Sequence, residues 1–186
     1  MDKYYDFQSV IIQIEEKINY RQAKARLNEN GALLYLDPEK KKRIEEALEK
    51  RNKDETAVNY VFNKLREKQE FLHDDGQVDC AKFYKHARIS PDVWSTFISD
   101  LHNIREDTQM KIIIGLALTE EEAVEFLSLV GTSFSTNNPL HRVILACIDC
   151  EFYDPDLVYD ILEYYIEIYY KKNEGKKCKP FRNIYK

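Results

Sequence analysis

The sequence predicts an all-α fold: a helical bundle that contains two short helices joined by a tight turn, preceded by an N-terminal helical hairpin or extension. Apolar residues recur every three or four positions through most of the 186 residues, as one face of a helix requires. Ser, Thr, Asp or Asn stands before several of these runs, in places followed by Pro, and these residues favour helix N-termini. Alternating apolar runs bounded by hairpin turns are missing from the sequence, so we expect little or no strand.

The first region, residues 1–54, is expected to hold two helices. The apolar stripe of the first consists of Phe7, Val10, Ile11, Ile14, Ile18 and Ala25. Asn30 and Gly31 then supply residues that adopt left-handed backbone and end helices. Asp37 and Pro38 start a second helix as N-cap and first helical residue. That helix is charged and its apolar side is thin (Ile44, Ala47 and Leu48), so it needs a partner surface.

A linker at residues 52–54 precedes the main domain, which we place at residues 55–170. Its first helix carries a stripe of Val58, Val61, Phe62 and Leu65. Residues 73–76, His-Asp-Asp-Gly, have the composition of a turn. The remaining residues, 171–186, form a basic C-terminal tail.

The stretch after this turn predicts two short helices. The first spans about residues 79–86, a break follows near residues 88–90, and Ser90 caps the second helix with Pro91 at its first position. Two short helices that cross steeply must share a small apolar centre. Five apolar residues stand at the spacing that such a centre requires: Phe83, Ala87, Ile89, Trp94 and Phe97. The turn usually takes Gly because its backbone tends towards positive φ, so Arg88 carries a mild cost.

Further helices follow from clear end signals. Thr119 and Glu122 form a capping box, Gly131 is the expected C-cap, and Asn138 with Pro139 starts another helix. The last helix spans about residues 154–170 with an aromatic-rich stripe: Leu157, Ile161, Leu162, Tyr165, Ile168 and Tyr169. Such a stripe is more typical of a core, and the alternative is the interface of a homodimer.

The order of these features resembles a known family. The segments in chain order are AKFYKHARISPDVWSTFISD, TQMKIIIGLALT, EEEAVEFLSLVGTSFSTNNPLHRVILACID and YDPDLVYDILEYY. They resemble a lambda-repressor-like (Xre-type) helix-turn-helix domain, in particular the helical C-terminal domain of some bacterial macro-domain proteins. The resemblance covers residues 56–165 and includes no catalytic feature, so it bears on fold more than on activity.

A helix-turn-helix that reads DNA places the exposed face of its second helix against base edges, with cations nearby to hold phosphates. On that reading, the candidate base-contacting residues are Ser95, Thr96, Ser99 and Asn103. The candidate phosphate contacts are Lys82, Lys85, Arg88, Arg105 and Lys111. This chain departs from the family, which usually has basic residues on the second helix, whereas here Asp92 and Asp100 would face the phosphates.

The charge distribution is also unfavourable to DNA over most of the chain. The net charge is -5; the tail carries seven Lys or Arg and one Glu, a charge of +6, which leaves about -11 for residues 1–170. A basic tail supplies attraction to phosphate that is independent of sequence and weakens with salt. A solvated tail that keeps an exposed terminus soluble is the more common reading.

Enzymatic readings find no support in the sequence. It has no Gly-rich phosphate loop, no Ser elbow and no paired-His zinc motif, so we expect no enzyme, no cofactor and no metal. Cys147 and Cys150 form a C-x-x-C inside an apolar helical run, where buried thiols are the more common role. We expect no secretory leader and no membrane span, and scattered cysteines agree with a cytoplasmic location.

Two functions from different classes remain open. The first is a DNA-binding transcriptional regulator or nucleic-acid-targeting accessory protein, favoured by the motif and its flanking cations. The second is a protein-interaction module, for example phage- or defence-associated, that keeps the scaffold and binds a partner protein. The acidic body and the lack of Lys or Arg on the second helix favour it.

Overall fold

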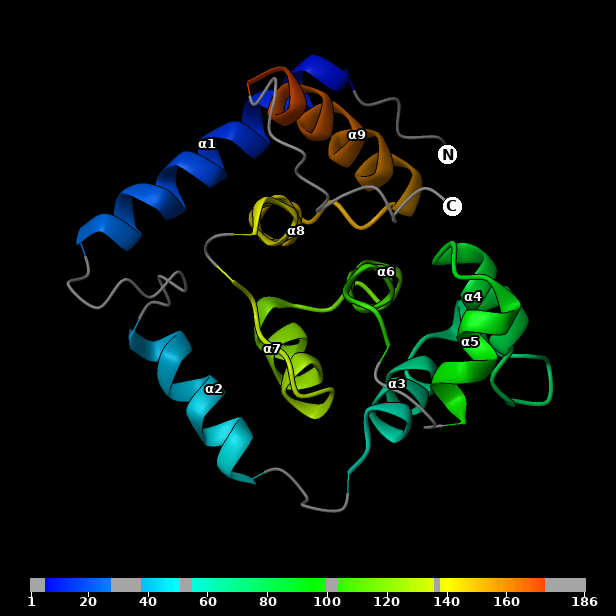
Figure 1. Cartoon of the computed structure of the whole chain (residues 1–186). Coiled ribbons are helices and arrows are strands. Elements are labelled where there is room, and N and C mark those ends of the chain that lie inside the picture. Colours follow the sequence, from blue (N-terminus) through cyan, green and yellow to red (C-terminus); the bar gives the residue numbers. More distant parts are fainter. Residues whose placement is uncertain (1–5, 28–37, 51–54, 100–103, 136–137, 173–186) are drawn as a thin grey trace. The chain divides into compact units, whose positions relative to one another are not determined.

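The computed structural model describes residues 6–27, 38–50, 55–99, 104–135 and 138–172, and these residues form an all-α structure (Figure 1). Within these ranges the structure has nine α-helices and one short 3-10 helix, with no strand. In this part of the chain, extended backbone pairs at an isolated bridge between Leu72 and Val78. The predicted fold class is therefore confirmed.

The chain divides into two compact units, one of Met1–Leu36 with Phe134–Lys186 and the other of Asp37–Ser133. The first holds α1 (Phe7–Leu27), α8 (Pro139–Asp149) and α9 (Pro155–Lys172). The second holds α2 (Pro38–Lys50), α3 (Ala57–Arg66), η1 (Gln69–Phe71), α4 (Cys80–His86), α5 (Pro91–Ile98), α6 (Glu106–Gly115) and α7 (Glu120–Leu129). The domain boundaries at residues 54 and 170 expected from the sequence stay a prediction.

The first unit is held together by contacts between the two ends of the chain. The apolar stripe of α1, centred on Val10, Ile11 and Ile14, is buried, and α1 packs against α8. At the other end of α1, the buried Arg21 donates two hydrogen bonds of 2.6 Å to the carboxylate of Asp149. Two parallel bonds from one guanidinium fix both position and angle, which explains why α1 groups with a helix far along the sequence.

The helix α8 is the core of this unit. Nearly every residue from Leu140 to Ile148 is buried, and α9 packs against it. The predicted start is confirmed, since Asn138 caps the helix and Pro139 is its first residue. His141 is buried, and its Nδ1 accepts a hydrogen bond of 2.7 Å from the backbone N–H of Ser135.

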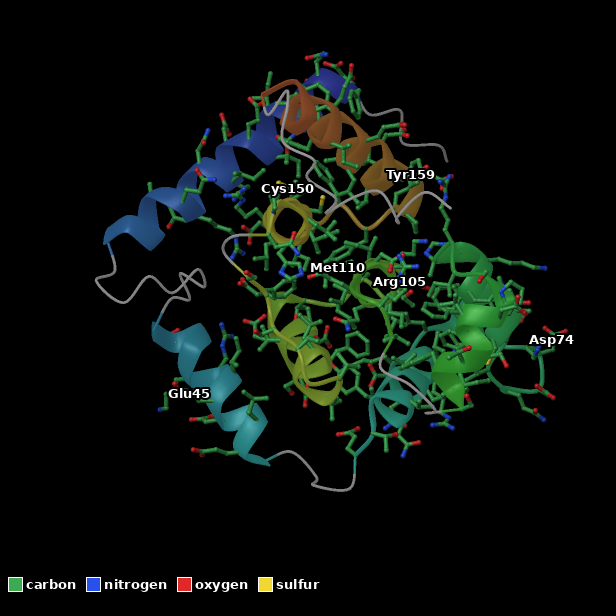
Figure 2. The ribbon with its side chains drawn as sticks, in the orientation of Figure 1. Glu45, Asp74, Arg105, Met110, Cys150 and Tyr159 are labelled. Atoms are coloured by element: carbon green, nitrogen blue, oxygen red, sulfur yellow. The ribbon has the colours of Figure 1, made fainter. Side chains whose placement is uncertain are left out.

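The helix α6 is the most buried helix of the second unit. Seven of its ten residues are buried, Met110 among them (Figure 2). The buried side chain of Gln109 is satisfied locally. The amide of Gln109 donates to the carbonyl of Ile104 at 2.9 Å and accepts from the Thr132 hydroxyl at 2.9 Å. The helix is therefore buried on almost all sides.

The helix α7 links α3 and α2 within this unit. Lys64 on α3 lies 2.7 Å from the Glu122 carboxylate, and the Tyr60 hydroxyl donates to the Glu122 carbonyl at 3.1 Å. The same Glu122 accepts from the Thr119 backbone, which confirms the predicted capping box. The helix α2 also packs against α7, with Ile44 buried and Arg43 lying 3.7 Å from Glu121.

Four helices end in the same way. The residue after each C-cap has positive φ: Arg88 (54°), Ala117 (47°), Gly131 (73°) and Glu151 (56°). In each case the next N–H returns to a carbonyl in the last helical turn, as Ile89 does to Tyr84 at 2.8 Å, which is the Schellman pattern. Gly131 was predicted as such a C-cap, and the structure confirms it. At the other three positions an L-residue adopts left-handed backbone, at a cost of about 1–2 kcal/mol each.

A substitution at Gly115 tests how closely α6 packs against α4. In an ordinary helix, Gly to Ala stabilises by roughly 1 kcal/mol. Here a Cβ at residue 115 would lie 2.7 Å from the Cβ of Ala87. We therefore expect Gly115→Ala to lower the free energy of unfolding by about 1–3 kcal/mol, as overpacking does. Urea unfolding followed by circular dichroism measures this change.

The matched control removes the opposing methyl group. Ala87→Gly in the Gly115→Ala protein should recover part of the lost stability, so that the double variant is more stable than additivity predicts. A Gly115→Ala protein at least as stable as the unchanged one would show that the two helices do not approach this closely.

Candidate interaction surface on α4 and α5

The helices α4 and α5 begin where the sequence predicted. Asp79 caps α4, its side chain accepting from the Lys82 N–H at 2.9 Å. Ser90 caps α5, accepting from the Val93 N–H at 3.3 Å, and Pro91 is the first helical residue. The N-termini of α4 and α5 are therefore both fixed by local hydrogen bonds.

All five residues predicted to form the apolar centre of this helix pair are buried: Phe83, Ala87, Ile89, Trp94 and Phe97. The ring of Trp94 lies 5.2 Å from Phe83, 5.4 Å from Phe97 and 6.4 Å from Phe62 on α3. Phe71 of η1 adds an edge contact with Phe83 at 5.3 Å. We call these five rings, Phe62, Phe71, Phe83, Trp94 and Phe97, the aromatic cluster. It fixes which face of α5 points away from the unit.

The turn between the helices contains Arg88 in left-handed conformation, with φ of 54°. The sequence anticipated positive φ here, and the structure confirms it. The Arg88 carbonyl accepts a hydrogen bond of 3.0 Å from the Lys111 ammonium. Lys111 is half-buried, and burial holds its pKa below the usual lysine value. This lysine therefore supports the turn.

The exposed stripe of α5 consists of Asp92, Ser95, Thr96 and Ser99. These residues stand three or four positions apart and so share one side of the helix. The Thr96 hydroxyl donates to the Asp92 carbonyl at 2.8 Å, and the Ser99 hydroxyl donates to the Thr96 carbonyl at 2.9 Å. Both hydroxyl protons are thus used within the helix, while the oxygens can still accept. The predicted Asn103, with Asp100 and His102, lies outside the described residues.

Two apolar side chains border this stripe, and the sequence analysis did not single them out. Val93 is 38% exposed and Ile98 is 40% exposed. At 100° per residue they fall on opposite borders of the exposed stripe, next to the buried Trp94 and Phe97. This helical spacing can be read from the sequence, and it could have identified Val93 and Ile98 as residues at the border of the exposed stripe. The outward face of α5 thus combines hydroxyl groups with apolar borders and has one charge, Asp92.

The predicted phosphate-contacting residues have different roles in the structure. Lys82 and Lys85 are exposed on α4, and Arg88 is exposed in the turn. Arg105, labelled in Figure 2, lies 3.3 Å from Asp107 and forms an ion pair with it. Lys111, which is bonded to the turn, and Arg105 are therefore both engaged within the unit.

The cysteines form no disulfide in the described part of the chain, where Cys80, Cys147 and Cys150 are free. Cys147 is fully buried on α8, and burial raises the pKa of its thiol. Cys150, labelled in Figure 2, is half-buried. Cys178 lies outside the described residues. Across the described ranges, no group of three or more His, Cys, Asp or Glu side chains is placed to hold a metal ion, and no helix is both long and apolar enough to cross a membrane.

Comparison of the chain with protein-family models, with curated proteins and with solved structures found no match.

Arg88 provides a test of the turn. Arg88→Gly should relieve the left-handed strain of about 1–2 kcal/mol, less the entropy cost of glycine, about 0.5–1 kcal/mol. We expect the free energy of unfolding to rise by roughly 0.5–1 kcal/mol, measured by urea unfolding. Arg88→Ala is the control, because it removes the guanidinium but keeps an L-residue. Equal stability of the two variants would argue against a left-handed turn.

Proposed function

We propose that this protein is a protein-interaction module that binds a partner protein through the outward face of α5. The observation that carries the proposal is the pair Val93 and Ile98, exposed on either side of a stripe with no Lys or Arg. Charged residues are depleted from the centres of protein interfaces, where apolar contact dominates. The face of α5 fits that composition better than it fits a phosphate backbone.

The rigidity of α5 supports the same proposal. The aromatic cluster and the Ser90 cap hold the helix in place before any partner arrives. A surface already held in its binding conformation loses less entropy on association. The hydroxyl oxygens of Thr96 and Ser99 remain available as acceptors, so a partner that supplies donors between two apolar contacts would complement this face.

DNA reading remains the second candidate, and one observation favours it. Lys82, Lys85 and Arg88 are all exposed on α4 and the turn that leads into α5, where cations could hold phosphates. Against it stand Asp92 on the exposed stripe and the internal bonds of Arg105 and Lys111. Specific DNA binders neutralise several phosphates per subunit, so the protein-partner proposal has the stronger support.

A photo-crosslinking residue at Ser95 of the full chain tests the proposal in cells. We expect it to capture one protein, which is then purified and titrated with the unmodified chain. Val93→Asp and Ile98→Asp should each weaken that binding about 30-fold, corresponding to the roughly 2 kcal/mol typical of a residue central to an interface. Ile12→Asp on α1 is the matched control, since Ile12 is 55% exposed and lies on the other unit.

The DNA reading is tested with labelled genomic fragments titrated at low and moderate salt. We expect no fragment to bind better than random DNA. If one does, and Thr96→Glu abolishes that preference while Lys85→Ala lowers the salt slope by about one, α5 reads DNA and the protein-partner proposal is wrong.

A further inference from the structure

The last turn of α8, in the first unit, carries a pair of thiols that the surface of α5 does not involve. Cys147 is fully buried, whereas Cys150, the C-cap of the helix, is half-buried. The backbone N–H of Cys150 donates to the carbonyls of Ala146 and Cys147, at 3.1 and 3.2 Å, so the helical spacing extends to Cys150. The two cysteines therefore stand on one face of α8, and Cys150 is the more exposed.

The spacing of Cys147 and Cys150 suits a disulfide after a small rearrangement. Residues three apart in an α-helix have Cα atoms about 5 Å apart, within the range of about 4.4–6.8 Å found across disulfides. Their Cβ atoms lie about 5–6 Å apart, whereas a disulfide brings the Cβ atoms to about 3.5–4.5 Å. Closing the bond therefore requires the last turn of α8 to shift by roughly 1–2 Å.

The turn that would shift also contains Asp149. The Asp149 carboxylate accepts both hydrogen bonds of 2.6 Å from Arg21, and these bonds join α1 to α8. Two parallel charge-assisted bonds depend closely on the position and angle of both groups. Because Asp149 lies between Cys147 and Cys150 in the sequence, a shift of this turn displaces its carboxylate and weakens both bonds.

We propose that Cys147 and Cys150 form a reversible disulfide, and that its closure loosens the attachment of α1 to α8. The oxidant is a low-molecular-weight disulfide, of which glutathione disulfide is an example. The Cys150 thiolate attacks one sulfur of the oxidant and releases one glutathione thiolate. The Cys147 thiolate then attacks the Cys150 sulfur and releases the second glutathione thiolate. The two protons of the protein thiols end on the two glutathione thiols, so one disulfide is reduced as the other forms.

The unequal exposure of the two thiols fits this order of steps. Cys150 can meet an oxidant from solvent, while Cys147 reacts with its neighbour on the same helix and needs no path to solvent. Burial raises the pKa of the Cys150 thiol. The nearby Lys17 acts in the opposite direction, and Asp149 and Glu16 raise this pKa further. Because the thiolate is the attacking species, the first step is slow at neutral pH and is followed over hours.

Incubation of the full chain with glutathione disulfide, followed by alkylation of the remaining thiols and peptide mass mapping, tests the first part of the proposal. We expect a disulfide between Cys147 and Cys150. Cys147→Ala should stop the reaction at a glutathione adduct on Cys150, whereas Cys150→Ala, the matched control, should leave Cys147 unmodified. If Cys150 pairs with Cys80 or Cys178 instead, or if no disulfide forms at Cys147, the proposal is overturned.

Hydrogen exchange tests the second part, the loosening of α1. In the oxidised protein, the amides of Val10, Ile11 and Ile14 should exchange at least about 10-fold faster, as the loss of one charge-assisted pair implies. The amides of α6, in the other unit, are the internal control and should not change. Arg21→Gln lacks the bonds to Asp149, so oxidation of that variant should have little further effect on α1. Unchanged exchange of α1 after the disulfide has formed, or equal acceleration in Arg21→Gln, would show that closure does not act through Asp149.

Discussion

The burial of Trp94 is the constraint on which the surface of α5 depends. The indole contacts Phe62, Phe83 and Phe97 and so ties α5 to α3 and α4 at once. A helix turns 100° per residue, so a shift of one position would bury a hydroxyl residue and leave an aromatic ring in water. Burying a hydroxyl without a partner and exposing a large ring are both costly. The buried Trp94 therefore determines which side chains of α5 are exposed.

The features that were predicted correctly depend on residues that lie within about one helical turn of each other in the sequence. The caps of Ser90 and Thr119 and the left-handed Gly131 depend on residues two to four positions away, and all are confirmed. The grouping of α1 with α8 was not anticipated. The bond between Arg21 and Asp149 joins residues 128 positions apart, and nothing in either local sequence distinguishes that arginine from a solvated one.

The candidate site was predictable in part. Periodicity indicated the exposure of Ser95, Thr96 and Ser99, and the structure places them on the outside of α5. The helical periodicity of the sequence does not indicate which ion pair or hydrogen bond a Lys or Arg side chain forms. Arg105 pairs with a residue two positions away and Lys111 supports a turn 23 positions earlier in the chain, so both were counted as available from composition alone. The sequence analysis made no prediction for the apolar borders, Val93 and Ile98, which adjoin the core residues Trp94 and Phe97 in the sequence.

The first unit is built from two distant parts of the chain, and this affects its biosynthesis. Roughly 110 residues separate the end of α1 from the start of α8. At about 5–20 residues per second, translation therefore delivers α8 roughly 5–20 s after α1 has left the ribosome. All residues of the second unit emerge during that interval, so it can fold first. Until α8 arrives, Val10, Ile11 and Ile14 have no partner, and the nascent chain carries an apolar face that other unfinished chains on the same polysome can reach.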